Sequence, residues 1–379
     1  MEYFSNSQII IKLKFFIISS IFVTFIFSQQ AFSQNESCLE EDKICNWIKK
    51  VVAIKTPTMV ASGILISDDL IVTNKHVAED SEKVLVRMPD KKIVAAIPIP
   101  NDHPADIIFL SLSDRSQKIE FETIEFQPKE VIMVAFDIGR NSIRIFERSK
   151  TLSFPNKKNK QARIHSSTRN LPGTSGGALI DNKGNLIGII ASGGGQYNEA
   201  VPAILLQDIY ELNNKESKKF YERGKSIRLC ADGLEEIKEY QQSPSNLLIK
   251  KIQNNCEFSN NKFLLDMAGQ AFGKVGLLND AIYFLEKSTN LDPQSPTSLH
   301  SLAIALHLNK SYEREIPILK TLLEIIPEDP QVLRLSVQAA AFTKNKAFGD
   351  YAISLMEIHS KQLPRHKKLR SMLIIIQFL

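Results

Sequence analysis

The chain has 379 residues, more than a single hydrophobic core usually organises, so its length predicts at least two domains. Its hydrophobic content of 43% and charged content of 23% are those of ordinary globular proteins. The net charge of +5 is small for this length, and Lys and Arg alternate with Asp and Glu, so no nucleic-acid-binding surface is expected.

The N-terminus has the pattern of a secretory signal peptide over residues 1–33. Two lysines precede Phe15–Phe27, an unbroken run of apolar and small residues, and Ala31-Phe32-Ser33 has the small-x-small form of a cleavage site. We therefore predict an exported protein, periplasmic or secreted. The alternative is an uncleaved segment that anchors the protein, and only in that case do we expect contact with a membrane.

The four cysteines fit an oxidising compartment, where thiols tend to pair. Local pairing of Cys38 with Cys45 and of Cys230 with Cys256 is the simplest of the possible connectivities. No cysteine pair has histidines at metal-ligand spacing. We expect no metal and no organic cofactor.

A succession of short apolar segments predicts a β-rich domain from Trp47 to about Ile209, because Gly or polar pairs separate the segments and none has helical periodicity. This pattern indicates a sandwich or barrel. The predicted strands are Val51–Ile54, Ser62–Ile66, Leu70–Thr73, Val84–Val86, Ile93–Ala95, Ile107–Leu110, Val131–Val134, Ile143–Phe146, Ala178–Ile180 and Leu186–Ile190.

The glycine-rich stretch from Asn170 to Ala178 is typical of a loop that presents a serine nucleophile. Small residues on both sides of Ser175 permit a sharp bend. The amide N–H groups of Gly173 and Ser175 can then act as an oxyanion hole, because they can converge on the oxyanion of a tetrahedral intermediate.

Two further candidates lie at strand ends. His76 follows the predicted strand Leu70–Thr73, where a short turn can aim an imidazole into a cleft. Asp106 directly precedes the strand Ile107–Leu110. A buried carboxylate needs a partner, and a histidine can provide one.

These three residues, in this order and local context, resemble the trypsin-like serine proteases, most of all the bacterial HtrA/Deg type. His76 lies in Thr-Asn-Lys-His-Val, Asp106 in Ala-Asp-Ile-Ile-Phe-Leu and Ser175 in Pro-Gly-Thr-Ser-Gly-Gly-Ala. The resemblance implies two six-stranded antiparallel β-barrels with the triad between them. Ser175 would attack the substrate carbonyl, His76 would transfer the proton, and Asp106 would orient the imidazole.

The sequence departs from the family pattern at two positions of the nucleophile loop. Thr174 stands where the family usually has Asn or Asp, and Ala178 replaces a frequent proline. Neither change removes a catalytic atom, but Thr174 leaves open how rigidly the oxyanion loop is held.

The resemblance also implies a substrate pocket with Arg169 at its base and Ala191, Ser192 and Gly193 along one wall. If Arg169 points inward, a like charge disfavours cleavage after Lys or Arg. If Arg169 turns outward to solvent, the pocket is apolar and accepts Val, Ala or Leu.

Residues 213–260 are charged and polar and predict a partly helical connecting region, without the PDZ module that HtrA proteins usually carry. Beyond it, Pro293 and Pro327 lie 34 residues apart, and each ends a predicted pair of amphipathic helices. We interpret residues 261–362 as tetratricopeptide-like repeats, with a generic helical hairpin as the alternative and with small residues at Gly269 and Ala303 for close helix packing. Pro317 suits only the first turn of a helix.

The sequence thus predicts a multidomain protein: a signal peptide (1–33), a trypsin-like serine protease domain (34–212), a connecting region (213–260), helical repeats (261–362) and a C-terminal tail (363–379). The predicted function is a serine endopeptidase whose repeats bind protein or peptide substrates or a partner protein. The alternative is a catalytically inactive scaffold or chaperone-like binding protein.

Overall fold

The computed structural model describes residues 38–78, 80–113, 120–121, 127–155, 159–169, 171–194, 197–213, 217–239 and 244–360. The predicted signal peptide and the C-terminal tail 363–379 lie outside these residues. From Glu41 onward the chain forms one compact unit, which begins with α2 (Asp42–Cys45) and a short 3-10 helix (Asn46–Lys49).

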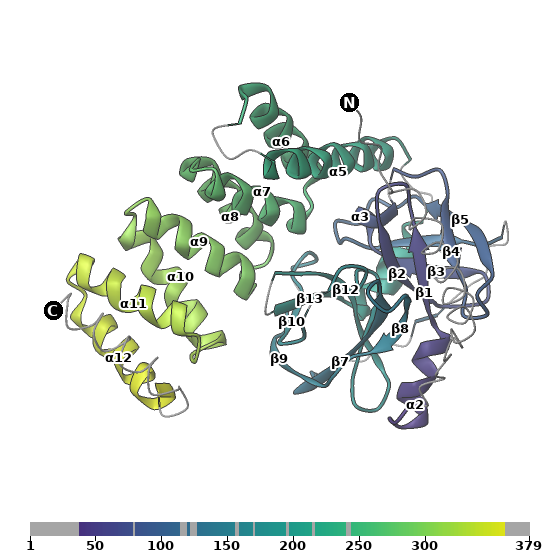
Figure 1. Cartoon of the computed structure of the whole chain (residues 1–379), viewed down its shortest axis with the longest axis horizontal. Coiled ribbons are helices and arrows are strands. Elements are labelled where there is room, and N and C mark those ends of the chain that lie inside the picture. The colour runs from purple at the N-terminus through teal and green to yellow at the C-terminus, as the bar shows by residue number, and fades with distance from the viewer. Residues whose placement is uncertain are drawn as a thin grey trace, which may run out of the picture. The chain divides into compact units, whose positions relative to one another are not determined.

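The first six strands close into an antiparallel barrel in the order β1-β2-β3-β6-β5-β4. They are β1 (Val51–Lys55), β2 (Val60–Leu65), β3 (Leu70–Thr73), β4 (Val84–Arg87), β5 (Ile93–Ile99) and β6 (Ile108–Ser111). Figure 1 labels β1 to β5 of this barrel. A one-turn helix, α3 (Lys75–Ala78), follows β3.

The second set of strands pairs in the order β11-β12-β13-β10-β9-β7, and pairing of β11 with β7 closes a second antiparallel barrel, while β8 extends the sheet beside β7. The strands are β7 (Glu130–Asp137), β8 (Ser142–Ile145), β9 (Ser149–Ser153), β10 (Ile164–Ser166), β11 (Ala178–Ile180), β12 (Leu186–Gly194) and β13 (Tyr197–Pro202). The predicted fold of two six-stranded barrels is confirmed.

Strands that are apolar on both faces explain how the barrels pack. In β1, Val52 and Ile54 belong to the core cluster inside the first barrel. Val51, on the opposite face of the same strand, packs in a second cluster with Ile132 and Ile180 of the second barrel. Successive side chains of a strand point to opposite faces. In an unbroken apolar run, one set of alternate side chains therefore packs inside the barrel, and the other set packs against the second barrel.

A helical region (residues 217–360) follows the barrels and α4 (Leu206–Glu211). Its helices are α5 (Ser217–Lys238), α6 (Asn246–Ser259), α7 (Lys262–Lys274), α8 (Leu278–Leu291), α9 (Pro296–Leu308), α10 (Tyr312–Ile325), α11 (Pro330–Thr343) and α12 (Lys346–Ser360). The predicted connecting region is therefore two regular helices, α5 and α6. No helix among the described residues is long and apolar enough to span a membrane.

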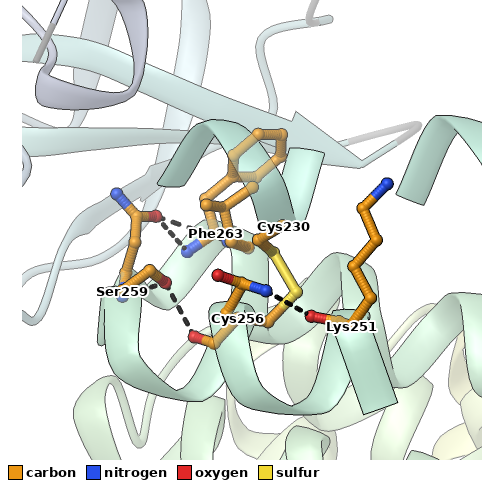
Figure 2. The surroundings of a disulfide bond; sticks show 8 residues. Cys230, Lys251, Cys256, Ser259 and Phe263 are labelled. Carbon is orange, nitrogen blue, oxygen red and sulfur yellow. Dashed lines mark hydrogen bonds between the residues drawn. A yellow bond between two sulfur atoms is a disulfide. The ribbon is translucent and has the colours of Figure 1, made fainter. Parts of the chain in front are cut away.

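The Cys230–Cys256 disulfide joins α5 to α6 and has Phe263, at the start of α7, among its surroundings (Figure 2). Cys38 and Cys45 are also disulfide-bonded. The loop from α6 to α7 is ordered by hydrogen bonds, since the Asn261 side chain accepts from the Phe263 N–H at 3.0 Å. This N-cap fixes where α7 begins.

The helices from α7 onward pack as successive pairs, and the first helices of the pairs, α7, α9 and α11, also contact one another. Close packing depends on Gly269, where an added Cβ would lie 2.4 Å from Leu285 Cγ.

The expectation for Pro317 is wrong, because this residue lies inside α10 rather than in its first turn. Pro317 lacks an N–H, so the helix forgoes one backbone hydrogen bond there.

The helical region packs on both barrels. Phe220 of α5 is fully buried in the core cluster of the first barrel. On the second barrel, His165 of β10 pairs with Asp292 at the end of α8, with 2.8 Å between Nε2 and Oδ2. The Tyr197 hydroxyl donates to Asp329 at 3.4 Å. The helices thus connect to each barrel separately.

Ser62 of β2 makes polar contacts with the second barrel. Its N–H donates to the Ser175 carbonyl at 2.7 Å, and its hydroxyl donates to the Gly173 carbonyl at 2.7 Å and accepts from the Phe136 N–H at 2.8 Å. Thr73 donates to the Ser62 carbonyl at 2.8 Å. One buried serine therefore ties the nucleophile loop of the second barrel to the first barrel.

Gly176 makes this contact possible, and Gly176→Ala should disrupt it. The residue has a φ of +85°, and an added Cβ would lie 1.9 Å from the Ser62 carbonyl oxygen. We expect a loss of more than about 3 kcal/mol in the free energy of unfolding, measured by urea denaturation.

Gly276→Ala is the matched control for this prediction. Gly276 has a φ of +81°, but nothing lies within 4 Å of its added Cβ. We expect a loss of about 1 kcal/mol, from the backbone conformation alone. Equal losses in the two variants would show that the contact with Ser62 does not limit this position.

Candidate active site

His76 and Asp106 form a hydrogen-bonded pair. The His76 Nδ1 and Asp106 Oδ2 atoms are 2.7 Å apart, and the His76 N–H donates to Asp106 Oδ1 at 3.1 Å. Asn74 donates from its side chain to the Asp106 carbonyl at 3.0 Å. The helix α3 and the loop before β6 are thereby held together, and the pairing leaves His76 Nε2 as the ring nitrogen available for other chemistry.

Asp106 is buried, with 5% of its surface exposed. Burial alone would raise the pKa of its carboxyl group, but His76 and Arg163 more than offset this, and the pKa is lowered. The Arg163 guanidinium lies 3.6 Å from Asp106 Oδ2. The carboxylate therefore stays ionised and can stabilise a charged imidazole.

Ser175 lines the same cleft as His76, but its hydroxyl donates to the carbonyl oxygen of Ala191 at 3.1 Å. In the part of the chain that the structure describes, no hydrogen bond joins Ser175 to His76. A rotation of the Ser175 side chain about its Cα–Cβ bond is needed before the hydroxyl can meet the imidazole.

The loop around Ser175 carries the two N–H groups that the sequence analysis assigns to an oxyanion hole. Gly173 has a φ of +94°, and the N–H groups of Gly173 and Ser175 have no hydrogen-bond acceptor among the described residues. Thr174 is buried, and its hydroxyl donates to the Leu171 carbonyl at 2.8 Å. The sequence left open how rigidly Thr174 holds this loop. The hydrogen bond from its hydroxyl anchors the loop beside the two N–H groups.

The cleft that contains His76 and Ser175 has a volume of about 1010 Å³. One side is formed by the barrels and the other by the helical region, which contributes Ile227, Ala231, Phe263, Leu264 and Met267. The Phe263 ring lies 5.5 Å from the His76 ring, measured between centroids, with 47° between their planes. Helices α5 and α7 therefore form a wall of the site.

The predicted pocket residues lie in different surroundings. Arg169 is exposed and does not line the cleft. Ala191 is fully buried in β12, and Ser192 and Gly193 continue this strand, paired with Glu199 and Asn198 of β13.

A chain of buried charges extends from Asp106 to the helical region. Arg163 Nη1 lies 3.2 Å from Glu199 Oε2, and Glu199 Oε1 pairs with the ammonium group of Lys262 at the start of α7. Each of the three side chains is at most 3% exposed. Burial alone would raise the pKa of Glu199, but Lys262 and Arg163 hold it well below its usual range.

The sequence analysis missed these residues because no local pattern marks them. The available signal was the charge of Arg163 and Glu199 beside the apolar residues Ile164 and Ala200, in segments that were not predicted as strands. A second buried acid, Asp266, lies one turn after Lys262, and burial raises its pKa to about 6.

Comparison with known proteins agrees with the fold. Residues 61–189 match the family model of the trypsin-like peptidase domain. A comparison with curated proteins finds no match.

Among solved structures, the chain is similar to an inactive serine-to-alanine mutant of Rv3671c from M. tuberculosis H37Rv, with 18% identity and a TM-score of 0.37. The match covers 45% of this chain and 89% of that chain. It is also similar to a serine endoprotease from Yersinia pestis, with 21% identity, a TM-score of 0.38, and 48% of this chain and 66% of that chain covered. The family model and the two closed barrels identify residues 61–189 as a trypsin-like peptidase domain.

Proposed function

We propose that the protein is an exported serine endopeptidase with Ser175, His76 and Asp106 as its triad. The observation that carries this proposal is that His76 pairs with Asp106, at 2.7 Å between Nδ1 and Oδ2, and lines one cleft with Ser175. Two disulfides, which involve all four cysteines, support an oxidising compartment.

In the proposed reaction, the Ser175 hydroxyl rotates away from Ala191 and attacks the substrate carbonyl carbon, while His76 Nε2 takes its proton. The Gly173 and Ser175 N–H groups donate to the oxyanion. His76 then gives the proton to the leaving amine as the C–N bond breaks, and water hydrolyses the acyl-enzyme by the same route. Asp106 keeps Nδ1 protonated and stabilises the imidazolium.

The alternative is an inactive scaffold, and the bond from the Ser175 hydroxyl to Ala191 is the observation that favours it. A catalytic arrangement requires the Ser175 hydroxyl to leave Ala191, and side-chain rotations of this kind are fast compared with enzymatic turnover. We therefore favour the enzyme, and covalent labelling of Ser175 distinguishes it from the inactive scaffold.

A fluorophosphonate probe should label the wild-type protein on Ser175 and should not label Ser175→Ala. His76→Ala should lose labelling to a similar extent, by at least about 10³-fold, because members of a triad act as a unit. Mass spectrometry of the labelled peptide gives the site, and circular dichroism gives the folding control. A folded wild-type protein that resists the probe, and does not cleave casein, would favour the scaffold.

We further propose that the substrate pocket is apolar and that cleavage follows Val, Ala or Leu. Apolar residues Val60, Ala61 and Ile138 line part of the cleft, beside charged side chains such as Asp80 and Arg228. Arg169 is exposed and does not line the cleft.

Profiling with a peptide library should show cleavage after small and branched apolar residues, and Arg169→Ala should leave this preference unchanged. A change of preference in Arg169→Ala would place this side chain in the pocket. Preferred cleavage after Lys or Arg in the wild-type protein would contradict an apolar pocket.

The helical region is proposed to bind protein substrates or a partner protein, whether or not its helices are tetratricopeptide repeats. Phe342 of α11 is 48% exposed and stacks on Tyr312 at 4.3 Å between ring centroids. Exposed aromatic side chains are frequent anchors in protein interfaces.

Phe342→Ser should weaken cleavage of a protein substrate such as casein by about 5-fold or more and leave cleavage of a small chromogenic peptide unchanged. Ile358→Ser is the matched control, because Ile358 is an exposed apolar residue of α12, at 62%. If Phe342→Ser lowers both activities together, the helices support the barrels and do not bind the substrate at this face.

A further inference from the structure

Four buried side chains alternate in charge between the catalytic pair and the helical region. They are Asp106, Arg163, Glu199 and Lys262, and each contacts the next. They come from the loop before β6, the segment before β10, strand β13 and helix α7. Both barrels and the helical region therefore contribute to one connected set of charges.

The cost of burying these charges argues that the set has a function beyond packing. Removing an ion from water costs several kcal/mol even after pairing, and apolar residues of similar volume often replace buried ion pairs without loss of stability. Helix α7 already packs through Leu264, Leu265 and Ala268. Lys262 is not needed to provide apolar contact, yet it is buried, with additional hydrogen bonding to Ser295 at 2.9 Å.

We propose that Arg163 is a positioning residue for Asp106 and that Glu199 and Lys262 extend its action to helix α7, so that the docked helical region sets the charge balance at the His76–Asp106 pair. The proposal rests on the catalytic role proposed above for this pair. It makes the helical region a part of the catalytic unit, in addition to any role in binding.

Other charged groups lie beside His76 in sequence, along its cleft or on helix α7, and must be held constant in a test. Lys75 is its neighbour in α3, and its ammonium group donates to the carbonyl oxygens of Asn101 and His103. Further charged groups along the cleft and on α7 are Asp80, Glu82, Lys83, Arg228, Asp232, Glu235 and Asp266.

The alternation gives a signature that a general loss of structure cannot produce. Removing the cation at Arg163 or Lys262 leaves more negative charge near His76, favours its protonated form and moves the titration midpoint of His76 to higher pH. Removing the anion at Glu199 does the opposite. We expect the largest change for Arg163→Gln, because Arg163 contacts Asp106, and smaller changes for the more distant residues.

The test is the titration of His76 by NMR in protein labelled with ¹³C-histidine, in the Ser175→Ala background, with His76→Ala to assign the signal. Arg163→Gln and Lys262→Met should raise the midpoint, and Glu199→Gln should lower it. The double variant Glu199→Gln/Lys262→Met removes one charge of each sign and should return it near the parent value. In enzyme with Ser175, the acid limb of the pH dependence of fluorophosphonate labelling should move in the same directions.

Two controls separate charge from docking. Lys262→Arg keeps the cation and should leave the midpoint unchanged. Tyr197→Phe removes the hydroxyl that donates to Asp329 of the helical region, without a change of charge, and should also leave it unchanged. Circular dichroism checks folding, and if Glu199→Gln does not fold, Lys262→Met and the double variant still give different predictions: a raised midpoint in the first and a midpoint near the parent value in the second.

Unshifted midpoints, or shifts of one sign in all variants, would overturn the proposal. Because NMR titration does not require activity, this result is distinct from failure of the proposed function. That failure would appear as a wild-type protein that the fluorophosphonate does not label, whatever the midpoints.

Discussion

The buried carboxylate of Asp106 is the constraint on which the rest of the site depends. Its charge lies inside the protein, so compensating groups must come to it, and they come from separate parts of the chain. His76 reaches it from the first barrel at 2.7 Å and Arg163 from the second at 3.6 Å. Arg163 is itself buried and needs Glu199, which in turn pairs with Lys262. Keeping Asp106 ionised thus requires the first barrel, the second barrel and the helical region to approach one another closely.

The barrels could be predicted largely from sequence because most of their strands are apolar on both faces. Continuous apolar runs such as β7, buried from Val131 to Asp137, stand out from their surroundings. Strands β10 and β13 were missed for the opposite reason. They carry His165, Asn198 and Glu199, whose partners lie in remote segments. Sequence patterns assign a buried polar residue to a loop as long as its hydrogen-bond or ion-pair partner is not known.

In the candidate site, too, the sequence predicted some features and missed others. His76, Asp106 and Ser175 lie in short local motifs, and the structure brings the first two into contact and the third into the same cleft. The orientation of the Ser175 hydroxyl toward Ala191 depends on one rotatable bond, which no motif specifies. The place of Phe263 beside His76 depends on how α7 is docked, and helical periodicity predicts a helix but not its neighbour.

The start of α7 also has a consequence for the order of assembly. A chain made from its N-terminus contains both barrels before Lys262 and Phe263 have been added, and domains generally fold in the order in which they emerge. The cleft at that stage lacks the wall that Phe263, Leu264 and Met267 provide. The last side of the cleft is therefore built only after the segment that the Cys230–Cys256 bond encloses has been made.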